Sequence, residues 1–317
     1  METEIIISQI VILAIVVLIG AVSARFKVIT NESKDMLSKV IFNISLPLML
    51  FTNFLRLDAT PRLLANSAIV LGVSGIIIFL MLLVGWLTTR MVKMDGREAA
   101  VFKAHSMFGN IIFLGFPLIT ALYGEEGLLY ASMFQLISNI IMWTVGVVVL
   151  SHGNGKSWQK SLSRIINPNT IATLIGLVFF LFSVKLPDVI MTPFSALGSA
   201  NTWLSMLYIG AMMYLSDVKG LVGRKLIYIL SFNRLVLMPA LLVTLFALFA
   251  SVAGFLPDKL VTAVIILEAS MPCMATVVIM SKELGADDKL AVANVFVSTL
   301  VSIITLPLVM MAINRFL

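Results

Sequence analysis

Long apolar runs alternate with short polar segments along the whole chain. A helix needs about 20 apolar residues to cross the roughly 30 Å hydrocarbon core of a bilayer. This pattern predicts an all-α polytopic membrane protein with ten spans. The expected spans cover residues 5–24, 36–54, 66–88, 99–122, 127–150, 170–186, 194–216, 226–251, 259–281 and 290–313.

Composition agrees with this pattern: 60% of the 317 residues are apolar, 12% are charged, and the mean hydropathy is +1.07. Soluble domains have a smaller share of apolar residues and a larger share of charged ones. The single Cys273 excludes an intrachain disulfide. Glu2 and Glu4 stand where a signal peptide carries basic residues, so we expect the first apolar run to be a retained span.

The net charge of +6 comes from cations in short loops, which favours membrane topology over a nucleic-acid partner. Counting on alternate sides of the ten spans places five cations on one side: Arg56, Arg62, Lys185, Lys259 and Arg315. The other side carries sixteen: Arg25, Lys27, Lys34, Lys39, Arg90, Lys93, Arg97, Lys103, Lys156, Lys160, Arg164, Lys219, Arg224, Lys225, Lys282 and Lys289. The positive-inside rule therefore predicts a multi-pass protein of the plasma (inner) membrane with both termini outside.

An internal repeat supports the ten-span count. HSMFGNIIFLGFPLITALYGEEGLLYASMFQLIS (105–138) aligns with ASMPCMATVVIMSKELGADDKLAVANVFVSTLVS (269–302), with one gap of about three residues. Because each half has five spans, the second half starts on the opposite side of the membrane. We expect two inverted five-helix repeats, residues 1–152 and 170–317, joined by a cytoplasmic linker at 153–169. The alternative is chance similarity between two apolar stretches.

Prolines interrupt the predicted spans. A proline removes one helical hydrogen bond, and freed backbone groups in hydrocarbon need protein, water or a ligand as partners. Asn110 precedes Pro117 by two helical turns, so the two would form a polar notch where helices cross. Pro272 breaks span nine in the same way. Asn43 and Pro47 are expected to break span two and either line the site or serve packing.

Glu268 lies about ten residues into span nine, where a charge costs at least about 2.5 kcal/mol. It is expected to be protonated, paired or functional, or to hydrogen bond a neighbouring helix. Ser270 and Thr276 supply oxygens near the Pro272 break, so the three residues form a candidate site for a coupling proton or Na⁺.

Two further ionisable residues lie in predicted spans. Arg234 is eight residues inside span eight, and we expect it to snorkel toward the cytoplasmic interface, with anion pairing as the alternative. His105 lies near the cytoplasmic end of span four, where a satisfied or solvated histidine is favoured over a proton relay.

Enzyme chemistry has no support in the sequence. HExxH, CxxC and GxSxG motifs are missing, and SHGNGKSW (151–158) lacks the first glycine of a phosphate-binding loop because position 150 is leucine. We therefore expect no catalytic residues and no cofactor apart from a coupling Na⁺ or H⁺.

Several motifs resemble the auxin efflux carrier family, which includes bacterial malate or malonate permease-like transporters. They are SLPLMLF, GNIIFLGFPL, ASMPCMATVVIMSKELG and VSTLVSIITLPLV. The resemblance implies that spans four and nine are broken and cross. It also implies a scaffold of spans one, two, six and seven, and a transport domain of spans three to five and eight to ten. By motif, Asn110, Pro117 and Pro272 would flank the substrate site, and a homodimer is a family-level expectation.

These observations predict a secondary transporter that moves a small organic carboxylate by alternating access, with helix N-termini facing the carboxylate. A sodium-coupled bile-acid-type symporter or a cation/proton antiporter shares the same ten-span plan and is the nearest alternative. A membrane sensor or interaction protein without transport is an alternative of another class.

Overall fold

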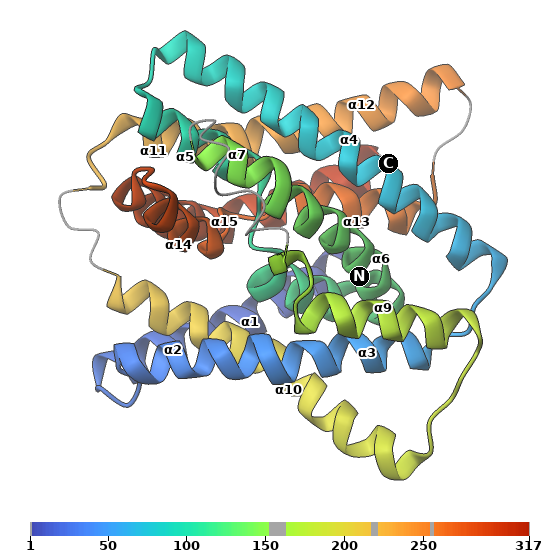
Figure 1. Ribbon diagram of the computed structural model, residues 1–317. Coiled ribbons are helices and arrows are strands. Elements are labelled where there is room, and N and C mark those ends of the chain that lie inside the picture. Colours follow the sequence, from blue (N-terminus) through green and yellow to red (C-terminus); the bar gives the residue numbers. More distant parts are fainter. Residues whose placement is uncertain (1, 152–162, 217–220, 254–256, 317) are drawn as a thin grey trace. The chain divides into compact units, whose positions relative to one another are not determined.

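The computed structural model describes residues 2–151, 163–216, 221–253 and 257–316 (Figure 1). Within these ranges the regular structure is helical, and the only β pairing is an isolated bridge. Five helical stretches there are long and apolar enough to cross a membrane: Asn31–Arg56, Pro61–Val92, Ile111–Leu150, Lys225–Val252 and Asp288–Phe316. The predicted all-helical membrane fold is confirmed, whereas the ten-span inverted repeat stays a prediction.

The contacts divide the chain into two compact units. Unit 1 consists of Met1–Ala68, Ile112–Leu136 and Ile166–Ser216, and unit 2 of Ile69–Ile111, Ile137–Ile165 and Asp217–Leu317. The predicted repeats and the predicted scaffold and transport domains stay predictions. Residues 153–162 of the expected linker lie outside the described residues.

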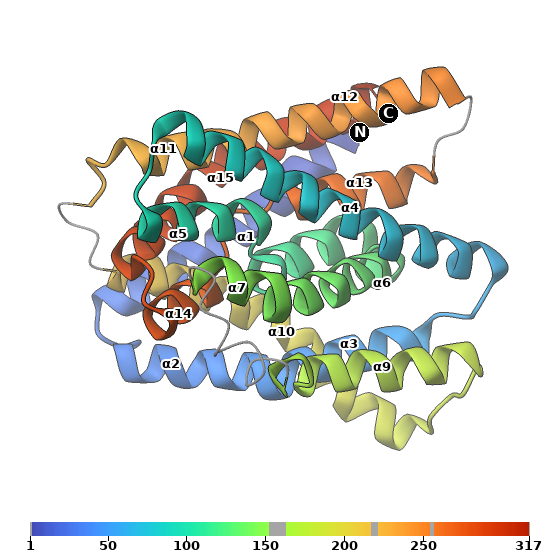
Figure 2. The same ribbon diagram turned by 45° about the horizontal axis from the view of Figure 1, so that its top comes forward.

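Unit 1 is built from helices that run beside one another (Figures 1 and 2). α10 packs against α1, and α3 packs against both α9 and α10. Its elements are α1 Glu2–Arg25, α2 Asn31–Val40, the π-helical turn η1 Ile41–Ser45, α3 Leu46–Arg56, α9 Pro168–Leu181 and α10 Asp188–Leu215, with parts of α4, η2 and α6.

Glycines let α1 and α10 approach closely. A Cβ atom on Gly210 would overlap the backbone carbonyl oxygen of Val17, and one on Gly20 would overlap that of Leu207. Small residues at a crossing bring helix backbones together in a membrane, where apolar burial gives no drive for association. The crossing of α1 and α10 therefore depends on these two glycines.

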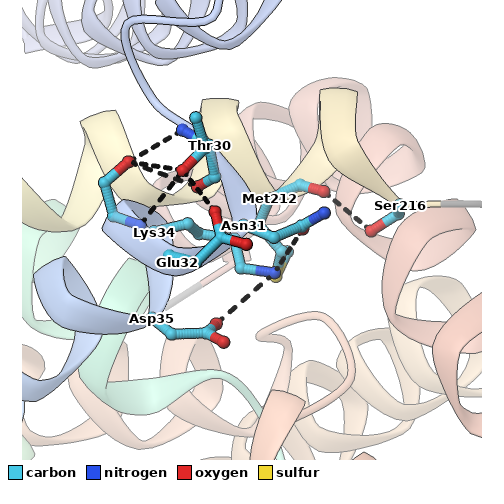
Figure 3. A network of polar contacts seen from close by, with 8 residues as sticks. Thr30, Asn31, Glu32, Lys34, Asp35, Met212 and Ser216 are labelled. Atoms are coloured by element: carbon cyan, nitrogen blue, oxygen red, sulfur yellow. Dashed lines mark hydrogen bonds and ion pairs between the residues drawn. The ribbon is translucent and has the colours of Figure 1, made fainter.

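The start of α2 is fixed by its own side chains (Figure 3). The Thr30 side chain accepts from the backbone N–H of Ser33, and the Ser33 side chain accepts from that of Thr30, which forms a capping box. Lys34 Nζ lies 3.5 Å from Asp35 Oδ1 and donates to Asn31 Oδ1 at 3.3 Å. The helix then continues without a break into η1 and α3.

The expected break of span two at Pro47 is therefore wrong. Residues 31–56 form one helix. The π turn η1 immediately precedes α3, and Pro47 is the second residue of α3. A π turn inserts one extra residue and shifts the hydrogen-bond register. The π turn contains the carbonyl four residues before Pro47, so the helix accommodates the proline there without breaking.

Unit 2 contains most of α4 Pro61–Val92, together with α5 Gly96–Met107, η3 Met142–Gly146, α7 Val147–Leu150, η4 Ser163–Ile165, α11 Lys225–Phe232, η5 Asn233–Leu237, α12 Met238–Ala253, α13 Lys259–Ala269, α14 Ala275–Leu284 and α15 Asp288–Phe316. α15 packs against α5, α11, α12, α13 and α14 (Figures 1 and 2). It is the central helix of this unit.

η2 Ile111–Gly115 and α6 Phe116–Ile141 run from unit 2 into unit 1 and back. Gly124 interrupts α6 with φ 64° and ψ −148°, a conformation that L side chains rarely adopt. The expected turn between spans four and five therefore lies at this glycine.

We predict that Gly210→Ala weakens unit 1, because the new methyl group must push α1 away from α10. Overpacking of this kind costs about 1–3 kcal/mol. Thermal unfolding in detergent measures the loss. Gly72→Ala is the matched control, since a Cβ there meets nothing within 4 Å and alanine favours helix. Equal melting temperatures for the two variants would contradict the close crossing.

Candidate functional site

Two helices of unit 2 are interrupted inside apolar sequence. α5 ends at Met107, Phe108 is extended with φ −110° and ψ 123°, and the chain becomes helical again at Ile111. α13 ends at Ala269, and α14 begins at Ala275. Residues 108–110 and 270–274 are all buried. The breaks thus place non-helical backbone in the interior of unit 2.

The two breaks cross and pair with each other. Asn110 N–H donates to the Pro272 carbonyl oxygen at 2.8 Å, and Met274 N–H donates to that of Phe108 at 3.3 Å. Between these bonds, Gly109 and Cys273 form an antiparallel bridge. In hydrocarbon, backbone groups must find partners within the protein. Each break supplies the partners that the other lacks.

Arg234 holds this crossing together. Its side chain is 1% exposed, Nε donates to the Met271 carbonyl oxygen at 2.5 Å, and Nη1 donates to those of His105 and Ser106 at 2.8 and 2.7 Å. The His105 and Ser106 carbonyls lie in the last turn of α5, and the Met271 carbonyl lies two residues after α13 ends. A cation is favourable at helix C-terminal ends. A Cβ on Gly109 would overlap Nη2 of Arg234. Gly109 is therefore required for the guanidinium to reach both helix ends.

The expectation that Arg234 snorkels to the interface is wrong. Snorkelling assumes an isolated helix with no partner at depth. Here the breaks expose carbonyl oxygens that a planar guanidinium can reach together, so the side chain stays inside.

His105 is fully buried in the crossing rather than solvated. Its Nε2 lies 3.3 Å from the Met274 carbonyl oxygen, and its Nδ1 lies 3.2 Å from Nδ2 of Asn294. These contacts fit a neutral ring with the proton on Nε2. One turn after Asn294, Ser298 accepts from the Cys273 N–H at 3.0 Å. α15 therefore positions both breaks through Asn294 and Ser298, two residues that the sequence did not single out.

The predicted coupling-ion residues all belong to unit 2. Glu268 is the next-to-last residue of α13 and is 1% exposed, and neither carboxyl oxygen has a hydrogen-bond partner among the described residues. The Ser270 hydroxyl donates to the Ile266 carbonyl oxygen at 2.6 Å, and Thr276 is half-buried in the first turn of α14. No hydrogen bond joins the three side chains within the described ranges, and their ion-binding role stays a prediction.

The predicted substrate residues divide between the units. Asn110 and Pro272 are brought together by the backbone hydrogen bond described above. Pro117, Asn43 and Pro47 belong to unit 1. Asn43 is exposed and donates to the Lys39 carbonyl oxygen at 2.9 Å. The break of span four lies at Phe108–Asn110 and not at Pro117, because the π turn η2 accommodates that proline as η1 accommodates Pro47.

The far end of α14 is fixed by an ion pair outside the spans. Arg224 Nη1 lies 2.8 Å from Asp287 and 3.8 Å from Glu98. Burial opposes ionisation of Asp287, but the Leu290 N–H and the Arg224 guanidinium together hold its pKa below the ordinary value. Burial raises the pKa of Glu98. α14 thus runs from the crossing to a charged anchor.

Comparison with known proteins identifies the family. The model of a family described as membrane transport protein matches residues 5–163 and 156–310, which is nearly the whole chain. The chain belongs to this family. It is the auxin efflux carrier family that the motifs indicated, so that prediction is confirmed.

Relatives of this transporter are themselves named transporters or carriers, and they align with it over nearly their whole length. An uncharacterized transporter of Methanocaldococcus jannaschii is 24% identical over 94% of this chain and 96% of its own. The uncharacterized transporter YfdV of Escherichia coli is 25% identical over 93% of each chain. Auxin efflux carrier component 8 of Arabidopsis thaliana is 22% identical over 90% of this chain and 91% of its own. The protein is therefore a multi-pass membrane transporter and not an enzyme.

We predict that Arg234→Lys destabilises this transporter. A single ammonium group cannot reproduce the fork that joins both helix ends, and each lost hydrogen bond from a charged group costs about 1.5–3 kcal/mol. Thermal unfolding in detergent measures the effect, with Arg224→Lys as control because a lysine there can still pair with Asp287. A melting temperature for Arg234→Lys equal to that of the control would contradict the bridging role.

We also predict an acid-dependent contribution from Asp287. Because its folded pKa lies below 3.8, the ionised carboxylate stabilises the fold above that value, and this stabilisation is lost as pH falls through the folded pKa. The difference in melting temperature between the wild type and Asp287→Asn should therefore shrink as the pH is lowered from about 6 to about 3. A difference that is independent of pH would show that the carboxylate charge plays no part.

Proposed function

We propose that the protein is a secondary transporter that moves a small organic carboxylate, of malate, malonate or auxin-like type, by alternating access. The observation that carries the proposal is the crossing of two interrupted helices around Arg234. No acidic side chain pairs with Arg234 among the described residues. Its charge is balanced only by carbonyl dipoles, which favours an anionic substrate nearby.

The N-terminal end of α14 adds to this preference. Met274 at its N-cap makes no side-chain capping bond, so the amides of the first turn rely on other partners. Helix N-termini carry partial positive charge and bind carboxylates in transporters with broken helices. We propose that Asn110 and the backbone around Pro272, both in unit 2, bind the substrate. Asn43, Pro47 and Pro117 stay sequence-based predictions.

We propose a coupling proton or Na⁺ at Glu268, with Ser270 and Thr276 as further ligands. A buried carboxyl group without partners is costly, and a bound cation or proton removes that cost. One elementary charge moved through 100 mV supplies about 2.3 kcal/mol, enough for roughly fiftyfold accumulation. Apart from this ion, the proposed transport needs no cofactor.

The proposal also covers the orientation of the protein in the membrane and its oligomeric state. The sixteen cations on one side support an inner-membrane protein with both termini outside, surrounded by membrane lipid. A homodimer is proposed from the family resemblance.

The central test is uptake of labelled malonate or malate into liposomes under proton, sodium or voltage gradients. We expect uptake by the wild type and a loss of at least about tenfold in Asn110→Ala, because the substrate loses a hydrogen bond in a desolvated site. Asn31→Ala, at an exposed helix start, is the control and should transport normally. No uptake of any carboxylate under any gradient would overturn the proposal. Binding without uptake would favour a membrane sensor.

A sodium-coupled carrier of the bile-acid symporter or antiporter type is the second candidate. The Glu268 carboxyl group favours it, because that group has no hydrogen-bond partner in the described ranges. In that case Na⁺ alone should raise the melting temperature, and Glu268→Gln should abolish the shift. A Na⁺-dependent shift that persists in Glu268→Gln would exclude Glu268 as the ion site.

A further inference from the structure

Unit 1 contains a cavity of about 380 Å³ with a partly polar lining, and none of its lining residues belongs to the crossing. α1, α3, α6 and α10 form its walls, and its lining includes Asn53, Arg56, Thr120, Glu125 and Trp203. Pockets for small ligands have volumes of roughly 300–1,000 Å³ and place a few polar groups among apolar ones. By size and chemistry, this cavity fits a small polar ligand with a flat or compact body.

The cation in this cavity is held loosely. Arg56 Nη1 donates to Glu125 Oε1 at 2.9 Å, and the two side chains are 45% and 41% exposed. In the described part of the chain, no other hydrogen bond engages the Arg56 guanidinium. An exposed ion pair contributes at most about 1 kcal/mol, whereas a guanidinium binds a free carboxylate best through two parallel bonds. Arg56 therefore keeps donors available for a second carboxylate.

A neighbouring pair shows the contrast. Arg62 Nη2 donates to both oxygens of Glu126, at 2.9 and 2.8 Å. Glu126 also accepts from the Tyr130 hydroxyl at 2.9 Å, and Tyr130 accepts from Asn66 at 3.0 Å. Neither Arg62 nor Glu126 lines the cavity. Arg62 is the more exposed arginine, at 60%, so the contrast between the two pairs lies in their hydrogen bonds and not in the exposure of the arginine. The Arg62–Glu126 pair has two hydrogen bonds and a third from Tyr130, whereas the Arg56–Glu125 pair rests on one.

We propose that this cavity is a second carboxylate-binding site, in which a free carboxylate exchanges with Glu125 for Arg56. The substrate class rests on the proposed function. Glu125 follows Gly124, whose backbone conformation bends α6, and its carbonyl oxygen accepts from Asn53 at 3.2 Å. The side chain of Glu125 can turn to solvent while its backbone stays in place, so exchange does not require unfolding of the turn.

The exchange predicts opposite effects for the two partners. Malonate binding is measured by calorimetry and by thermal stabilisation of the full-length protein in detergent. Arg56→Gln should weaken binding to the cavity on the order of tenfold or more, because the ionic donors are lost. Glu125→Gln should strengthen it severalfold, because the internal competitor is removed. Arg62→Gln and Glu126→Gln are the matched controls and should bind malonate as the wild type does.

The Asn110→Ala variant separates this site from the crossing. In that background the cavity should still bind malonate, and the addition of Arg56→Gln should remove the remaining binding. Melting temperatures without malonate confirm that each variant is folded. If the Arg56 and Glu125 variants weaken binding alike, or match the controls, the second site is overturned while the proposed function stands. If the wild type binds no carboxylate at all, both proposals are overturned.

Discussion

One guanidinium connects the ends of two interrupted helices, and the crossing depends on it. The last carbonyls of α5 and α13 have no continuing helix to bond, and apolar surroundings offer them no water. Arg234 donates to two such oxygens of α5 and to the carbonyl oxygen of Met271, just after α13. A lysine or a glutamine has neither the reach nor the fixed fork of donors for this task. The cost of burying one cation is therefore offset by the three hydrogen bonds that it donates to these carbonyls.

The hydrogen bonds between the two breaks are related by a local twofold symmetry. The alignment of residues 105–138 with 269–302 places Phe108 opposite Pro272 and Asn110 opposite Met274. The two hydrogen bonds, Asn110 to Pro272 and Met274 to Phe108, exchange under this correspondence. Ser106 and Ser270, which also align, each donate to the carbonyl oxygen four residues earlier. Arg234 breaks the symmetry, because it contacts two carbonyls of one segment and one of the other.

Hydropathy predicted the long helices well, because length and apolar composition alone decide whether a segment such as α4 or α15 spans a membrane. Prolines were a weaker guide. Pro272 marks a real interruption, but Pro47 and Pro117 follow π turns within continuous helix, and sequence does not reveal where one residue will be inserted. Arg234 was misjudged because its partners are backbone carbonyls from distant segments, which have no signature in side-chain pattern. Asn294 and Ser298 are polar residues one turn apart in an apolar span, and this spacing could have predicted a helix face that hydrogen bonds neighbouring segments.

Two ionisable side chains of unit 2, Arg234 and Glu268, are equally buried but differ in their hydrogen bonding. Arg234 donates three hydrogen bonds to backbone carbonyls, and its removal would take these bonds away. Glu268 is equally buried but has both oxygens unsatisfied within the described structure. A group that only served stability would gain from a partner or from an apolar replacement. An acid that has no partner among the described residues and lies one residue from the end of α13 therefore supports the proposed coupling site, where a proton or cation would bind in some states of a transport cycle and leave in others.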